Sequence, residues 1–311
     1  MSTMLRLPAT LVLVALAAAA CSTGGASTSS PTTGPTSPAS PAASPLNPTT
    51  VPSPSSEGIL HPTGAEEIVL RLDEAGGFTP PEWQAARIPY FTLYGDGRVV
   101  FIQTTATLPE RSDNVFVGMP LRTATLSEDQ VQELLAYALR EGGLAIARES
   151  YDNPMVADAP SSIFTINAEN DTKTVNVMAL GMENQPGPDT AVLKQLATLG
   201  DLLRNFDQGG AARSDPYEAT AYRAVILEQQ GGVEGIQVRE WPWTDITPAA
   251  FTLPKDVNAL PQGTKTLTPE QVAAVGVEPY QNGISSGVWL RAEDGKVYSL
   301  VIRPLLPGEK A

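Results

Sequence analysis

The sequence predicts an α+β protein with a mainly antiparallel sheet and two or three packed helices, preceded by a disordered N-terminal spacer. Short runs of apolar and β-branched residues, bounded by turn residues, recur from about residue 66 onward. Two longer segments repeat apolar residues at helical spacing. Residues 22–56 are almost wholly Ser, Thr, Pro, Ala and Gly, a composition that buries too little apolar surface to offset chain entropy.

The first 20 residues have the order of features of a signal peptide. Arg6 supplies the basic start, residues 7–16 form an apolar run, and Ala17–Ala20 are the small residues before a cleavage site. The apolar run is too short to cross a bilayer comfortably. We therefore expect residues 1–20 to be removed on export.

Cys21, the single cysteine of the chain, directly follows these small residues. The stretch MSTMLRLPATLVLVALAAAAC resembles the lipobox of bacterial lipoproteins, whose cysteine becomes the acylated N-terminus. The resemblance implies a palmitate-type anchor on Cys21 at the outer face of the cell membrane. Ala18 stands where the family usually has leucine, so ordinary cleavage after Ala20 and secretion is the alternative.

Residues 21–57 are expected to act as a disordered tether. About 35 residues span roughly 30–35 Å as a coil and about 110 Å as extended polyproline II. A tether of that length would carry a folded domain away from the membrane and into the cell envelope.

The formal net charge of −14 disfavours nucleic acid as a partner, because binding to phosphates requires Lys and Arg. The single cysteine excludes an intrachain disulfide, a Cys-rich zinc site and an iron–sulfur cluster. The single histidine, His61, excludes His-pair metal sites. A Ser-His-Asp triad would have to use His61, which we expect to be poorly held beside the tether. We expect no metal and no cofactor.

The first α+β domain is expected over residues 58–207. Its predicted strands are Ile68–Leu72, Tyr90–Tyr94, Arg98–Thr104, Ile163–Ala168 and Thr172–Leu180. Its predicted helices are Ser127–Glu141, with the stripe Val131, Leu134, Leu135 and Ala138, and Thr190–Phe206, with the stripe Val192, Leu196, Leu199, Leu203 and Phe206.

Residues 208–215 are the expected linker, and residues 216–311 a second, smaller α+β portion packed on the first. This portion is expected to start with the strand Tyr222–Gln229 and to end with a hairpin of Val288–Arg291 and Val297–Arg303. The βα alternation of a two-lobed substrate-capture protein is not evident.

Two helix starts have the capping-box spacing, Ser127 with Gln130 and Thr268 with Gln271. Asp96-Gly97 and Asp294-Gly295 each separate two strand-like runs, the pattern of a hairpin turn in which glycine takes a positive φ. A calcium loop would need several carboxylates, and Asp96 is the single acidic residue between positions 89 and 108.

The series from EEIVLRLDEAGGFTPP through IPYFTLYGDGRVVFI, LSEDQVQELLAYAL and YDNPMVADAPSSIFTINAENDTKTVNV resembles a domain of bacterial secreted proteins and lipoproteins without assigned function. The likeness covers roughly residues 66–206 and implies a hairpin, a helix, a second hairpin and a last helix. It brings no catalytic residues. Relatives often have cysteines in the Gly-rich entry, where this chain has GGFTPP, so a shared disulfide is excluded.

The loop ESYDNPMVADAP, residues 149–160, is the first candidate binding site. It places Tyr151, Asp152, Asn153 and Asp158 between a helix and a strand, where binding groups are common. Asp152 and Asp158 have the chemistry of a glycosidase carboxylate pair. The alternative is that Asp and Asn form turns and Pro stiffens the loop.

The segment REWPWTDI, residues 239–246, is the second candidate. In an extended chain Trp241 and Trp243 face the same side, as a platform that stacks on sugar or proline would require. Burial in the core is the alternative.

These observations favour a non-enzymatic binding or interaction module at the cell surface, with a cell-wall glycan or an envelope protein as the candidate partner. The alternative is a carboxylate-based hydrolase of cell-wall glycans, the chemistry compatible with so few His and Cys residues. The sequence lacks a phosphate loop, a dinucleotide fingerprint and a nucleophile elbow.

Overall fold

The computed structural model describes residues 58–108, 110–111, 113, 115–182, 187–207, 213–231, 235–252, 262–277 and 283–309. Over these residues the chain forms two mainly antiparallel sheets and four α-helices, which confirms the predicted α+β class. The expected signal peptide, Cys21 and the tether of residues 21–57 lie outside the described residues, as do residues 208–212 of the expected linker.

The larger sheet, sheet A, has eight strands in the order β6-β8-β7-β1-β2-β3-β5-β9. All neighbours are antiparallel except β6 and β8, which are parallel. The strands are β1 (Ile68–Gly76), β2 (Phe91–Tyr94), β3 (Arg98–Ile102), β5 (Leu121–Thr125), β6 (Ser150–Tyr151), β7 (Pro160–Ala168), β8 (Asp171–Met178) and β9 (Asp215–Pro216).

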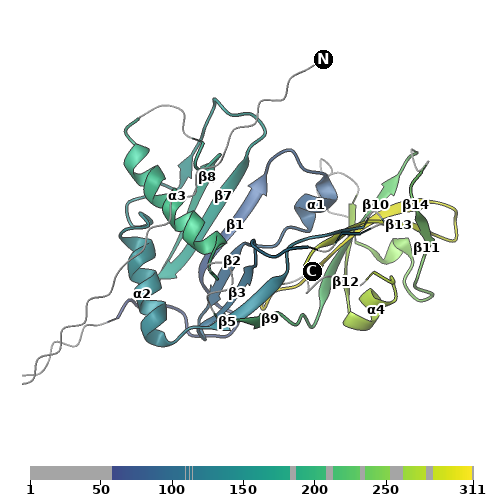
Figure 1. Cartoon of the computed structure of the whole chain (residues 1–311), viewed down its shortest axis with the longest axis horizontal. Helices are drawn as coiled ribbons and strands as arrows, with labels where there is room; N and C mark the ends of the chain where they lie inside the picture. Colours follow the sequence, from purple (N-terminus) through teal and green to yellow (C-terminus); the bar gives the residue numbers. More distant parts are fainter. Residues whose placement is uncertain are drawn as a thin grey trace, which may run out of the picture. The chain divides into compact units, whose positions relative to one another are not determined.

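Helices α2 (Glu128–Leu139) and α3 (Thr190–Arg204) lie along sheet A (Figure 1). The predicted apolar stripes are the buried faces, with Leu135 of α2 and Leu196 of α3 fully buried in one core with the sheet. Phe206 lies beyond the end of α3, where its ring packs 5.0 Å from that of Phe91.

The smaller sheet, sheet B, has the order β11-β13-β14-β10-β12, and β4 pairs with β13. Its strands are β4 (Phe116–Val117), β10 (Tyr222–Gln229), β11 (Val238–Glu240), β12 (Gln262–Leu267), β13 (Ser285–Arg291) and β14 (Val297–Pro304). The β13–β14 hairpin forms as predicted. The turn η1 (Pro248–Ala250) and helix α4 (Pro269–Ala273) belong to the same half of the sequence.

Strand β14 is buried along its whole length because both faces of sheet B are covered. One face packs Leu300 into a core that includes Trp243 and Phe251. On the other face Val301 packs with Val225 of β10 and Ala86, next to helix α1 (Pro81–Ala85). The first half of the chain therefore contributes both α1 and β4 to the surroundings of sheet B.

The structure confirms both predicted capping boxes. Ser127 Oγ accepts a hydrogen bond from the backbone N–H of Gln130, whose side chain accepts one from the N–H of Ser127. Thr268 and Gln271 repeat the arrangement at α4. These residues satisfy backbone donors that the first helical turn leaves free.

Both predicted Asp-Gly turns are confirmed. Gly97 and Gly295 have φ values of +81° and +79°. Asp96 Oδ1 accepts a hydrogen bond from the N–H of Arg98, and Asp294 Oδ1 accepts one from the N–H of Lys296, each at 3.0 Å. Asp96 therefore shapes the turn of the β2–β3 hairpin.

Candidate ligand-binding pocket

In the loop of residues 149–160, which was predicted as a binding site, the tyrosine is buried and has a structural role. Tyr151 ends β6 and is 5% exposed. Its hydroxyl accepts a hydrogen bond from the backbone N–H of Arg148 at 2.8 Å, and the Arg148 guanidinium lies over its ring at 4.7 Å. Tyr151 thus fixes the start of the loop from inside the protein.

The other three residues of that loop form turns near the surface. Asn153 Oδ1 accepts a hydrogen bond from the N–H of Met155, and Asp158 has a φ of +57° while its carbonyl accepts a bond from the N–H of Phe78. Asp152 and Asp158 are both exposed. Neither carboxylate lines any of the three cavities of the described chain discussed below.

The two tryptophans of the second candidate do lie together. Both follow strand β11, and the backbone N–H of Trp241 still bonds to the carbonyl of Arg291 on β13. Their ring centroids are 5.3 Å apart, with an angle of 80° between the planes. Trp243 is only 7% exposed, whereas Trp241 is partly exposed. The pair is therefore an edge-to-face contact with one accessible ring, and not a flat platform of two.

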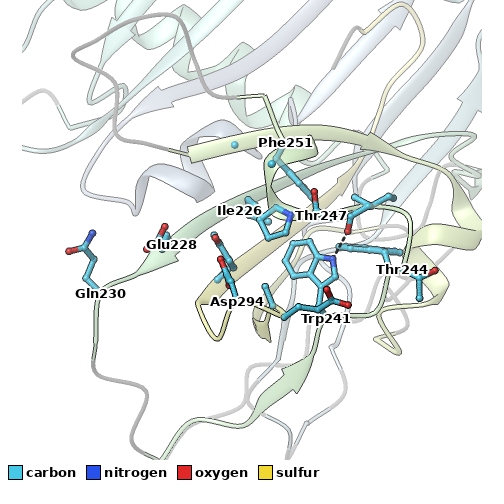
Figure 2. Close-up of a pocket in the computed structure, with 16 residues that line it drawn as sticks. Ile226, Glu228, Gln230, Trp241, Thr244, Thr247, Phe251 and Asp294 are labelled. Atoms are coloured by element: carbon cyan, nitrogen blue, oxygen red, sulfur yellow. Dashed lines mark hydrogen bonds between the residues drawn. The ribbon is translucent and has the colours of Figure 1, made fainter.

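Both tryptophans line a cavity of about 820 Å³ on sheet B, which we call the tryptophan pocket. Its aromatic wall is Trp241, Trp243, Phe251 and Tyr298. Its polar rim is Glu228, Gln230, Thr244, Thr247, Glu293 and Asp294. Figure 2 shows the ring of Trp241 at the centre, with Glu228, Gln230 and Asp294 to one side and Thr244 to the other.

The aromatic wall is held by edge contacts to Trp241. The ring of Tyr298 lies 5.8 Å away at 68°, and that of Phe251 lies 6.0 Å away at 75°. Aromatic rings favour such edge-to-face geometry, because the positive edge of one ring meets the negative face of another. The wall is therefore a preformed apolar surface.

Both indole N–H groups are used inside the protein. Trp241 Nε1 donates to the carbonyl of Ile246 at 2.5 Å, and Trp243 Nε1 donates to the carbonyl of Gln271 at 2.8 Å. The two bonds fix the rings against the following segment and against α4. The indoles thus offer a ligand ring surface and no hydrogen-bond donor.

Gly263 of β12 permits the close approach of Phe251. An alanine Cβ at this position would lie 2.7 Å from the Cβ of Phe251. Next to it, Thr252 and Thr264 exchange two backbone hydrogen bonds of 2.8 and 2.9 Å. A glycine inside a strand often marks such a close contact.

The rim of the pocket is acidic. Glu228 accepts a hydrogen bond from Lys296 Nζ at 2.8 Å, which raises the pKa of the lysine. Burial raises the pKa of Tyr298, and the nearby carboxylates of Asp294 and Glu228 raise it further. No Lys or Arg belongs to the lining that the structure describes.

A second cavity, of about 320 Å³, lies beside β1, β10 and β14 and is lined by balanced charges. Glu74 pairs with Arg87 at 3.1 Å, and Glu309 pairs with the buried guanidinium of Arg303. Burial raises the pKa of the adjacent Asp73. These groups largely neutralise one another, so we assign this cavity a structural role.

His61 lines a third cavity, of about 620 Å³, and the expectation that it is poorly held is wrong. Its side chain is 6% exposed. Nδ1 lies 2.7 Å from the carbonyl oxygen of Pro62, and Nε2 lies 3.1 Å from Glu128 Oε1. Contacts with the β7–β8 turn and with α2 hold the chain here, although the predicted tether ends only four residues earlier, at residue 57.

Among the described residues, no helix is both long and apolar enough to cross a membrane. The same residues contain no group of three or more His, Cys, Asp or Glu side chains placed to hold a metal ion.

No protein-family model matches this sequence, and comparisons with curated proteins and with solved structures gave no match.

Proposed function

We propose that this protein is an extracytoplasmic lipoprotein, anchored through Cys21, whose folded part is a non-enzymatic binding module. The single observation that carries the binding role is the tryptophan pocket, a preformed cavity with an aromatic wall and a polar rim. Its partner would be a small envelope molecule, such as a cell-wall glycan, or a side chain of an envelope protein.

The dimensions and chemistry of the pocket support this role. Ligand sites are commonly cavities of roughly 300–1,000 Å³, apolar for the most part, with a few polar groups that orient the ligand. The tryptophan pocket, at about 820 Å³, lies within that range. Because indole bonds and edge contacts already hold Trp241, little ordering of the wall would be needed on binding.

The hydrolase alternative gains no support from the geometry. It depended on Asp152 and Asp158, and both are exposed on a loop outside the three cavities described above. Binding without turnover is therefore the function we propose.

Replacing Trp241 with leucine should abolish binding in the pocket, because it removes the accessible ring. We expect a ligand at a hundred times its dissociation constant to stabilise the parent protein by about 2.7 kcal/mol and to raise its melting temperature by a few degrees. The measurement is thermal unfolding against peptidoglycan fragments, oligosaccharides, organic amines, peptides and lipids. Each stabilising ligand should lose its effect in Trp241→Leu.

The matched control is the double change of Asp152 and Asp158 to asparagine, which alters the other candidate loop and leaves the pocket intact. It should bind every ligand as the parent does. Ligand stabilisation that survives Trp241→Leu but disappears in the loop variant would refute the pocket and assign binding to the loop.

Replacing Cys21 with serine should release the protein from the membrane, because serine cannot accept the lipid through a thioether. The expected result is loss of fatty-acid labelling and a shift of nearly all the protein from the membrane fraction to the medium. An unlabelled parent protein, already secreted, would show that ordinary cleavage after Ala20 is the correct alternative.

A further inference from the structure

We infer that the tryptophan pocket selects an organic cation, that is, an ammonium or guanidinium group joined to an apolar body. This inference rests on the proposed binding function and adds the chemical class of the ligand. Three features of the described residues support it: the negative charge of the rim, the excess of hydrogen-bond acceptors over donors, and the accessible face of Trp241.

The rim has a net negative charge, which Lys296 offsets only in part. Of its three carboxylates, Glu228 is paired with Lys296, whose amine is half-exposed and is not part of the lining. Glu293 and Asp294 are exposed and form no ion pair in the part of the chain that the structure describes. An anionic ligand would be repelled here, and a cation would be attracted.

The pocket offers a ligand more acceptors than donors. Ionised carboxylates only accept hydrogen bonds. The two indole N–H groups, which would otherwise be donors, are satisfied by the carbonyls of Ile246 and Gln271. Thr244, Thr247 and Gln230 supply mixed groups at the edge. A ligand with its own N–H donors would satisfy these acceptors, and a quaternary ammonium would match them by its positive charge without hydrogen bonds.

Several tyrosine rings of this protein are already stacked by its own arginines. Arginine guanidinium groups stack on Tyr90, Tyr94 and Tyr151 at 4.7–5.3 Å. No such contact occurs on Trp241 within the described residues, although indole is the best ring for it. The partly exposed face of Trp241 and the carboxylates of the rim lie in one cavity.

A neutral sugar could stack on the aromatic wall but would gain no attraction to the carboxylates of the rim. On binding it would draw Glu293 and Asp294 partly out of water, a cost that neutral hydroxyl donors offset less well than a cation does. The acidic rim therefore favours a cation over an uncharged ligand with the same shape.

The test compares choline with its uncharged isostere, 3,3-dimethylbutan-1-ol, and uses benzyltrimethylammonium as a cation with a larger apolar body. Binding to the purified protein is measured by tryptophan fluorescence titration and calorimetry. We expect both cations to bind at least about tenfold more tightly than the isostere. Raising the salt to 1 M, where the screening length falls to about 3 Å, should weaken the binding of the two cations and leave that of the isostere unchanged.

Two substitutions, one that removes a negative charge and one that removes a positive charge, make the test specific for charge. Asp294→Asn removes the charge and keeps an oxygen that can accept the hydrogen bond of the turn. It should lower the affinity for the cations about three- to tenfold and leave the affinity for the isostere unchanged. Lys296→Gln frees Glu228 and should strengthen cation binding. Glu133→Gln, which removes the same charge from the exposed face of α2, is the matched control and should change nothing.

The outcomes separate this inference from the proposed function. If the isostere or a neutral oligosaccharide binds as well as choline, and binding is lost in Trp241→Leu, the pocket function stands and the cation inference fails. If both cations fail to bind at millimolar concentration, the inference is likewise overturned. If binding of every probe survives Trp241→Leu, both proposals fail.

Discussion

Replacing Gly97 with alanine should destabilise the folded protein by about 3 kcal/mol. Part of the loss is the cost of placing a Cβ at a φ of +81°, about 1 kcal/mol. The larger part is steric, because that Cβ would lie 2.5 Å from the carbonyl oxygen of Leu126. This carbonyl belongs to the backbone between β5 and α2, which cannot yield without disturbing both elements.

The second Asp-Gly turn provides a matched control for this substitution. Gly295 has nearly the same φ, +79°, but an alanine Cβ there would have no neighbouring atom within 4 Å. Gly295→Ala should therefore cost only about 1 kcal/mol, the backbone part alone. Urea denaturation of the two variants measures both values. Equal losses would show that the carbonyl of Leu126 moves aside freely.

Replacing Glu309 with glutamine should destabilise the protein by about 2–4 kcal/mol. The carboxylate pairs with the guanidinium of Arg303, whose side chain is 3% exposed, and also accepts a hydrogen bond from the N–H of Leu306 at 2.9 Å. The substitution would leave a buried positive charge without its main partner, and such charges are costly. Chemical denaturation at neutral pH gives the change in unfolding free energy.

A double variant distinguishes the charge effect from lost packing. Arg303→Met combined with Glu309→Gln removes both charges while keeping an apolar side chain of similar length on β14. Because a buried pair replaced as a unit is often close to neutral, the double variant should recover most of the stability lost in the single one. A double variant as unstable as Glu309→Gln alone would rule out the uncompensated charge as the cause.

Local signals in the sequence predicted local structure well. Tyr222–Gln229 is a strand with the predicted bounds, because its apolar and β-branched run pairs with β14 on one side and β12 on the other. The starts of α2 and α4 followed from hydroxyl and glutamine three residues apart, since capping involves only residues close in sequence.

Two strands that form by pairing with residues distant in sequence were not predicted. Strand β12 reads QGTKTL, with one strongly apolar residue, and it exists because β10 offers its backbone over six residues from Tyr222 to Leu227. Strand β4 has only two residues, Phe116–Val117, and forms by pairing with β13. No periodicity in such short or polar segments could have identified them.

The candidate site was predicted in part. The spacing of Trp241 and Trp243 drew attention to a segment that lines the tryptophan pocket, but it could not show that one ring is buried and turned by 80° from the other. The rim carboxylates were missed because Asp294 was explained fully by its turn and Glu228 lies 66 residues away on β10. Only the pairing of β10 with β14 brings Glu228 opposite Tyr298.

The pairing of β4 with β13 limits how this protein can move. A strand from the first half of the chain is hydrogen-bonded into the sheet of the second half, and α1 packs on β10 and β14. These contacts oppose a separation of the two halves of the kind seen between the lobes of a clamshell receptor. Under the proposed function, ligand capture would therefore be a local event on sheet B.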